Sequence, residues 1–101
     1  MDLYREICEM ASNGLNFAFG LVVETQGSTP QKAGAMAVVD DAGRQWGTLG
    51  GGLVEAQAID QVRASLQRSA PHVVEFRLDE AYSREAGPIC GGVMRILVAC
   101  P

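Results

Sequence analysis

The chain has 101 residues, of which 48% are hydrophobic and 20% charged, and its formal net charge is −4 at pH 7. This length supports one hydrophobic core, so we expect a single domain over residues 1–101, and the composition excludes a disordered chain. The negative charge leaves no basic surface to attract a phosphate backbone, so nucleic acid is not an expected partner.

The sequence also disfavours a membrane-spanning protein and a metal-binding protein. The longest apolar stretches, at residues 17–23 and 96–100, fall well short of the roughly 20 residues needed to cross a bilayer, and no basic-then-apolar leader precedes them. The cysteines at positions 8, 90 and 100 match neither a zinc-binding nor a redox spacing. We therefore expect a soluble, cytoplasmic protein without a metal site or a disulfide framework.

The first forty residues predict a helix followed by a buried strand and a loop. Asp2 can cap a helix that ends at Asn13-Gly14. Residues 17–23 are almost continuously apolar, which favours a central strand covered on both faces. The polar segment 25–34 carries two glycines and a proline and is predicted to be a loop.

The middle of the chain predicts a hairpin and a second helix. Strands at 35–39 and 44–48 flank a turn at 40–43, and the helix runs over residues 53–68. Its apolar side chains share one arc, which also contains the carboxylate of Glu55. The residues of this arc are Val54, Ala58, Ile59, Val62 and Leu66.

Two more strands are predicted near the end, at residues 72–78 and 93–98, with a long irregular connection at 79–92 between them. The resulting order is one helix, three strands, a second helix and two strands. This order predicts an α+β fold in which a mixed sheet of about five strands packs on two main helices.

Three glycine-bearing segments stand at predicted strand ends, where a ligand could approach the main chain closely. They are Gly27-Ser28-Thr29-Pro30, Gly47-Thr48-Leu49-Gly50-Gly51-Gly52 and Cys90-Gly91-Gly92. Each segment alone could equally be a plain turn, and Ser28 and Thr29 could serve either a turn or a ligand. The middle segment runs from a strand into a helix, which predicts main-chain N–H groups at the positive end of a helix dipole and so a place for an anion. It is neither a Walker loop nor a GxGxxG motif.

Glu55 and Cys90 each allow two interpretations. The Glu55 carboxylate could fold back onto the N–H groups at the helix start, or it could hold a ligand or accept a proton with a pKa raised by its apolar neighbours. Cys90 could be a buried small side chain or an accessible thiol beside main-chain N–H groups. No acid–base partner for Cys90 is evident in the sequence.

Taken in this order and spacing, the segments 27–36, 47–55 and 90–92 resemble the signature of the XdhC/CoxI family, and the resemblance covers nearly the whole chain. Relatives commonly carry a cysteine directly after the glycine triplet, where this chain has Leu53. Relatives also commonly continue into a Rossmann-like domain, which we do not expect after Pro101.

The resemblance implies a cytoplasmic accessory protein, more chaperone than enzyme, that binds molybdenum cofactor and delivers it to a xanthine dehydrogenase or CO dehydrogenase-type hydroxylase. It also implies a homodimer and possible contact with a cysteine desulfurase. The implied cofactor-binding residues are Gly27, Ser28, Thr29, Gly50, Gly51, Gly52, Glu55, Cys90, Gly91 and Gly92. Two alternatives stay open: an enzyme acting on the cofactor or another phosphorylated compound, with Glu55 as base and Cys90 as nucleophile, or a domain that only recruits other proteins.

Overall fold

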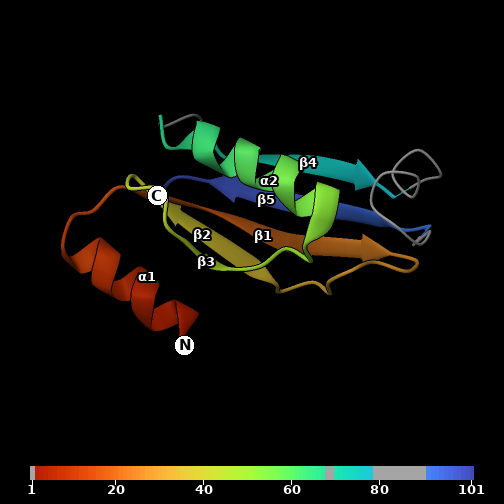
Figure 1. Ribbon diagram of the computed structural model, residues 1–101, viewed down its shortest axis with the longest axis horizontal. Helices are drawn as coiled ribbons and strands as arrows, with labels where there is room; N and C mark the ends of the chain where they lie inside the picture. The colour runs from red at the N-terminus through yellow and green to blue at the C-terminus, as the bar shows by residue number, and fades with distance from the viewer. Residues whose placement is uncertain (1, 68–69, 79–90) are drawn as a thin grey trace.

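Two helices and five strands make up the computed structural model, which describes residues 2–67, 70–78 and 91–101 (Figure 1). In chain order they are α1 (Leu3–Ser12), β1 (Phe17–Gln26), β2 (Met36–Asp40), β3 (Gln45–Gly47), α2 (Gly52–Ser65), β4 (His72–Arg77) and β5 (Val93–Ala99). Each predicted helix and strand is confirmed, with ends that differ by a few residues. The largest differences are at β1, which continues to Gln26, and at α2, which ends at Ser65.

The start of α1 is capped as the sequence predicts. The Asp2 carboxylate accepts hydrogen bonds from the N–H groups of Tyr4, at 3.1 Å, and Arg5, at 3.3 Å. These N–H groups have no carbonyl partner within the helix, so the carboxylate satisfies them and also complements the helix dipole.

Removing this cap gives a first expected result. Asp2→Ala should lower the free energy of unfolding by about 1 kcal/mol, the usual value for a lost N-cap. Urea denaturation followed by circular dichroism measures the change, and Asp2→Asn is the matched control because its amide oxygen can still cap the helix. Equal losses in the two variants would show that the cap hydrogen bonds do not stabilise α1.

The sheet has the strand order β3-β2-β1-β5-β4, so β1 lies at its centre as predicted. The α+β class and the five strands are confirmed, but the expected mixed pairing is wrong, because all four ladders between these strands are antiparallel. The reason lies in the path of the chain. The crossover through α2 joins β3 to β4, which point the same way but lie on opposite edges of the sheet, so they form no parallel ladder (Figure 1).

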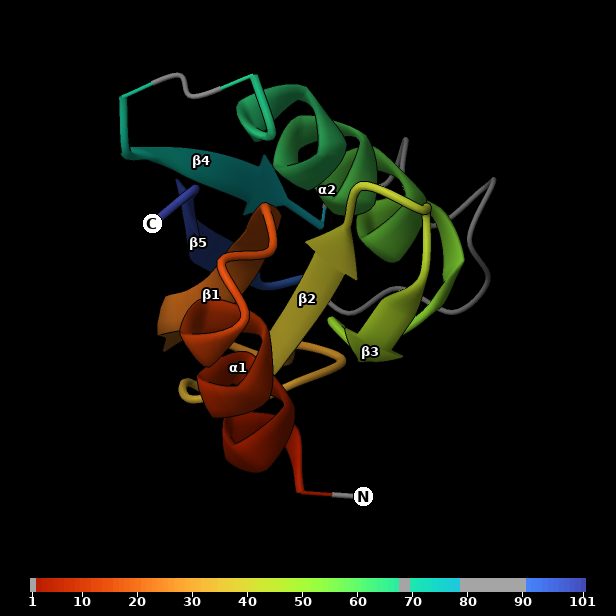
Figure 2. The same cartoon turned by 90° about the vertical axis from the view of Figure 1, so that its left-hand side faces the viewer.

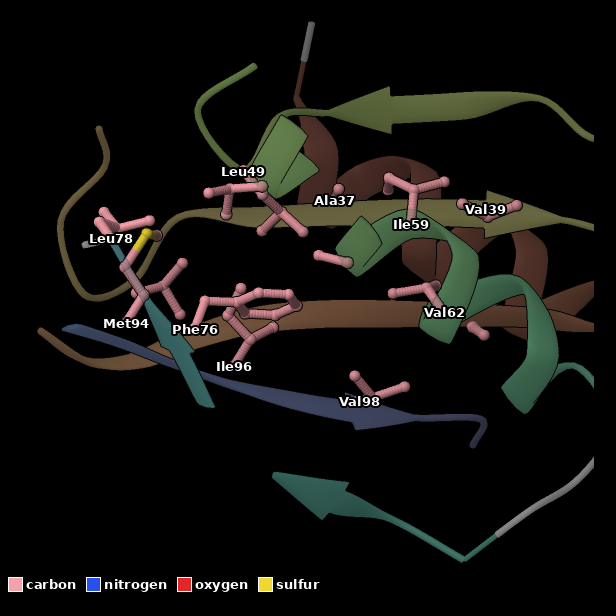
Figure 3. Close-up of a cluster of buried hydrophobic side chains, with 14 residues drawn as sticks. Ala37, Val39, Leu49, Ile59, Val62, Phe76, Leu78, Met94, Ile96 and Val98 are labelled. Carbon is pink, nitrogen blue, oxygen red and sulfur yellow. The ribbon is translucent and has the colours of Figure 1, made fainter. Parts of the chain in front are cut away.

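The two helices cover opposite faces of the sheet (Figures 1 and 2). Beneath α1, Met10 packs with Phe17 and Val38. On the other face, Ile59 and Val62 of α2 lie among buried side chains of the strands (Figure 3). This larger cluster consists of Ala18, Val22, Ala37, Val39, Leu49, Val54, Ala58, Ile59, Val62, Phe76, Leu78, Met94, Ile96 and Val98.

Strand β1 is therefore covered on both sides, as its apolar run predicts. Among the described residues, no helix is long and apolar enough to span a membrane.

The turn between β2 and β3 is held by a buried carboxylate. Asp40, whose side chain is only 6% exposed, accepts hydrogen bonds from the backbone N–H and the Nε of Arg44, each at 2.9 Å. Burial alone would raise the pKa of Asp40, but these bonds and the charge of Arg44 outweigh it and lower the pKa below 3.8. The guanidinium of Arg44 also lies 5.4 Å from the ring centre of Trp46, a cation–π contact within the hairpin. The turn of this hairpin lies at the end of the sheet away from the start of α2 (Figure 1).

Candidate functional site

The three glycine segments meet at one end of the molecule, where β1 ends and α2 begins (right-hand side of Figure 1). We call residues 27–30, 47–52 and 91–92 together the glycine rim. These segments are far apart in the sequence, and antiparallel pairing of β1 with β5 brings two of them to the same end of the sheet.

The first and third segments touch through their main chains. Ser28 and Gly91 form an isolated parallel bridge beyond the ends of β1 and β5. A β-carbon built at Gly27 would lie 3.3 Å from both the carbonyl oxygen of Gly91 and the α-carbon of Gly92. Side chains larger than hydrogen would therefore crowd this contact, which gives a physical reason for glycine on both sides.

The middle segment touches the first one from the other side. A β-carbon at Gly50 would lie 2.7 Å from the Cβ and 2.9 Å from the Cγ of Pro30. Next to this contact, the Thr29 hydroxyl donates a hydrogen bond to the carbonyl of Gln31 at 2.8 Å, which stabilises the turn. The loop 27–31 thus lies between the other two segments and links them.

The start of α2 is open. Gly51 is the cap residue and has no side chain to satisfy the N–H groups of the first turn, and Gly50, Gly51 and Gly52 all have positive φ. β-carbons built at Gly51 or Gly52 would meet no atom of the described residues within 4 Å. A ligand could therefore approach these α-carbons and the free N–H groups behind them, at the positive end of the helix dipole.

Glu55 points back at the loop that precedes its own helix. Its Oε1 accepts a hydrogen bond from the N–H of Leu49 at 2.6 Å and another from the hydroxyl of Thr48. Burial alone would raise the pKa of Glu55, but these bonds, with further ones from the N–H of Gly51 and the side chain of Gln45, lower it below 4.5.

Of the two interpretations left open for Glu55, the one with a raised pKa is therefore not supported, because the donors around the carboxylate outweigh its partial burial. A carboxylate with a lowered pKa is a poor proton acceptor at neutral pH. The geometry matches the capping interpretation: Glu55 braces the segment from Thr48 to Gly51 in the shape that exposes the helix start. Thr48 is a partner that the sequence did not single out.

A hollow of about 280 Å³ extends from the rim along the side of α2 that lies next to Gln45 of β3. It includes two residues of the predicted site, Gly52 and Glu55. The remaining lining residues are Gln45, Ala56, Ile59, Asp60 and Arg63. The sequence placed Asp60 and Arg63 on the polar side of the helix, but only the position of β3 beside α2 shows that they border a hollow.

Cys90 lies outside the described residues, so its thiol has no place in this geometry. Of its two neighbours in the motif, Gly91 is exposed and Gly92 is buried. Within residues 2–67, 70–78 and 91–101, no group of three or more His, Cys, Asp or Glu side chains is gathered so as to hold a metal ion.

Known proteins resemble this chain in sequence and in fold. The model of the XdhC and CoxI family matches residues 10–77, which is more than half of the chain. The chain belongs to the XdhC and CoxI family. The matched region includes the first two segments of the rim and the whole of α2.

Two longer proteins are similar to this XdhC/CoxI chain. It is 30% identical over 99 residues to the uncharacterized protein YqeB of Escherichia coli, and this match covers 98% of the chain but 18% of YqeB. A crystal structure described as a xanthine dehydrogenase from Bacillus halodurans has the same fold, with a TM-score of 0.77 at 21% identity, and the match covers 99% of the chain and 30% of that structure. The chain thus spans less than a third of the length of either relative.

Proposed function

We propose that this XdhC/CoxI chain binds molybdenum cofactor as cargo at the glycine rim and acts as an accessory protein for molybdenum hydroxylases of the xanthine dehydrogenase or CO dehydrogenase type. The observation that carries the proposal is the meeting of three sequence-distant glycine segments around a helix start whose cap residue, Gly51, has no side chain to satisfy the first-turn N–H groups. Family membership supports the choice of cargo.

The rim has the chemistry that a phosphate or a metal-bound oxyanion needs. Main-chain N–H groups at the start of α2 can donate hydrogen bonds, and the open space at Gly51 and Gly52 lets the anion come close to them. The nearby charge of Glu55 is already satisfied by donors from its own loop, which reduces its repulsion of an anion. The role of Glu55 in this proposal is to position the loop.

The enzyme alternative receives no support from Glu55, since a general base at neutral pH needs a raised pKa rather than a lowered one. Delivery to a hydroxylase, contact with a cysteine desulfurase and assembly as a homodimer are parts of the same proposal. Membership of the family supports proposing them.

An anaerobic titration with molybdenum cofactor tests the proposal. The protein should form a stoichiometric complex, and Gly51→Ala should weaken it about tenfold or more, because the methyl group would project into the space where the anion meets the helix start. Gly43→Ala is the matched control. Gly43 has a similar φ of +82°, against +77° for Gly51, and also has nothing within 4 Å, but it lies in the β2–β3 turn.

Equal weakening of cofactor binding by Gly51→Ala and Gly43→Ala would show that backbone strain alone changes the affinity. The glycine rim would then no longer be the proposed binding site. Binding of a hydroxylase without binding of cofactor would support the recruitment alternative instead. Cys90→Ala belongs in the same titration, because the resemblance places Cys90 among the cofactor-binding residues.

A further inference from the structure

The hollow beside the rim is lined mainly by polar groups, with a smaller apolar part. Ala56 and Ile59 supply the apolar part. They lie three residues apart on the same side of α2, and Ile59 is 5% exposed. Around them stand the side chains of Gln45, Asp60 and Arg63. Polar groups that converge on one hollow can fix the orientation of a small ligand.

Asp60 and Arg63 are the two charged groups at the end of the hollow away from the rim. They lie three residues apart on α2, so they project from the same side of the helix. None of the ion pairs between described residues includes either side chain, and both are exposed. A carboxylate and a guanidinium thus border the hollow with their hydrogen-bonding groups available to a ligand.

We propose that this hollow receives the pterin ring of the cargo and reads its aminopyrimidinone edge, an inference that rests on the function proposed above. The Asp60 carboxylate accepts hydrogen bonds from the ring amino group and the adjacent ring N–H. The Arg63 guanidinium donates to the neighbouring ring carbonyl and ring nitrogen, a pairing of two donors with two acceptors that arginine makes well. Ala56 and Ile59 lie under the face of the ring.

The position of the hollow also sets the direction of the cargo. From Gly52 to Arg63 the helix axis advances about 16 Å, at 1.5 Å per residue. The phosphate and the metal of the cofactor lie at the same end of that molecule, so they meet the N–H groups at Gly52 while the ring extends toward Asp60. A volume of about 280 Å³ suits one bicyclic ring system, and the rest of the cargo lies over the rim.

Binding of molybdenum cofactor by two variants tests this assignment. Asp60→Asn and Arg63→Gln should each raise the Kd about tenfold, because each loses a charged, two-point hydrogen-bonding partner. Glu9→Gln is the charge-matched control for Asp60→Asn, since Glu9 is an exposed residue of α1 on the opposite face of the sheet. Thermal unfolding of each variant confirms that it remains folded.

Competition experiments identify the ring edge. Hydroxymethylpterin should displace the cofactor from the wild-type protein, whereas the analogue without the ring amino group should displace it about tenfold less well, and Asp60→Asn should abolish that difference. Guanosine carries the same aminopyrimidinone edge on a different ring. Stronger competition by guanosine than by hydroxymethylpterin would assign the hollow to a guanine nucleotide and overturn the pterin assignment.

The results separate the two proposals. Cofactor binding that responds to Gly51→Ala but not to Asp60→Asn or Arg63→Gln would overturn the pterin site and leave the proposed function standing. Failure of hydroxymethylpterin to compete up to its solubility limit would also overturn the pterin site and leave the proposed function standing. Absence of cofactor binding by the wild-type protein would overturn both.

Discussion

Gly92→Ala is expected to lower the free energy of unfolding by about 3 kcal/mol, because the added β-carbon has no room and its neighbours cannot rotate away. It would lie 2.7 Å from the carbonyl oxygen of Gln26 and would also clash with the carbonyl oxygen of Ser28. Both obstacles are backbone atoms. Gly92 is buried, and its own carbonyl accepts a hydrogen bond from the N–H of Leu78 at 2.8 Å, so a shift to relieve the clash would disturb the ends of three strands.

Gly91→Ala is the control for this result. Gly91 has a φ of +67° and nothing within 4 Å of a built β-carbon, so its replacement should cost only about 1 kcal/mol, the price of a left-handed conformation. Urea denaturation of both variants gives the comparison. Similar losses in the two proteins would mean that the segment 27–28 is free to move away from Gly92, and the first and third segments of the rim would then not be held together as described.

The sequence predicted those parts of the fold whose signals are local. Asp2 precedes an amphipathic helix, and the apolar run in β1 identifies a strand covered on both faces; both predictions are confirmed. Such features depend on neighbours within a few residues, which the sequence displays directly.

Features that depend on pairing between distant segments could not be predicted in the same way. The register that places Glu24 opposite Arg95 joins residues from the two ends of the chain, and nothing local specifies it. The antiparallel form of the sheet has the same origin, since it follows from β3 and β4 lying on opposite edges. The hollow beside α2 also needed the tertiary position of Gln45 to be known.

The candidate site, too, could be predicted from the sequence only in part. The resemblance implied that residues of all three glycine motifs bind one cofactor, and the contacts of Gly27 with Gly92 and of Gly50 with Pro30 bring the motifs together. The direction of the Glu55 carboxylate was left open, because both interpretations place it in the first turn of the helix. Only the N–H of Leu49 and the hydroxyl of Thr48, which are set by the path of the loop, decide between them.

Glu55→Ala is expected to lower the free energy of unfolding by about 2 kcal/mol, because the N–H of buried Leu49 and that of Gly51 lose their acceptor. The loss should depend on pH with a definite sign. Since the folded-state pKa of Glu55 lies below its ordinary value of 4.5, the charged carboxylate stabilises the protein above that value, and the stabilisation fades as the pH falls through the folded-state pKa. The difference between wild type and variant should therefore be constant near neutrality and shrink in acid.

Glu55→Gln separates the charge of this side chain from its hydrogen bonds. The amide oxygen can still accept from Leu49, so this variant should lose less stability than Glu55→Ala. The difference in stability between these two variants should not shrink in acid, measured by urea denaturation between pH 3 and 7. If Glu55 braces the loop, Glu55→Gln should also keep most of its affinity for the cargo while Glu55→Ala loses it. A large loss of affinity in a stable Glu55→Gln protein would instead mean that the charged carboxylate meets the ligand itself, and the loop would then have to release Glu55 when the cargo binds.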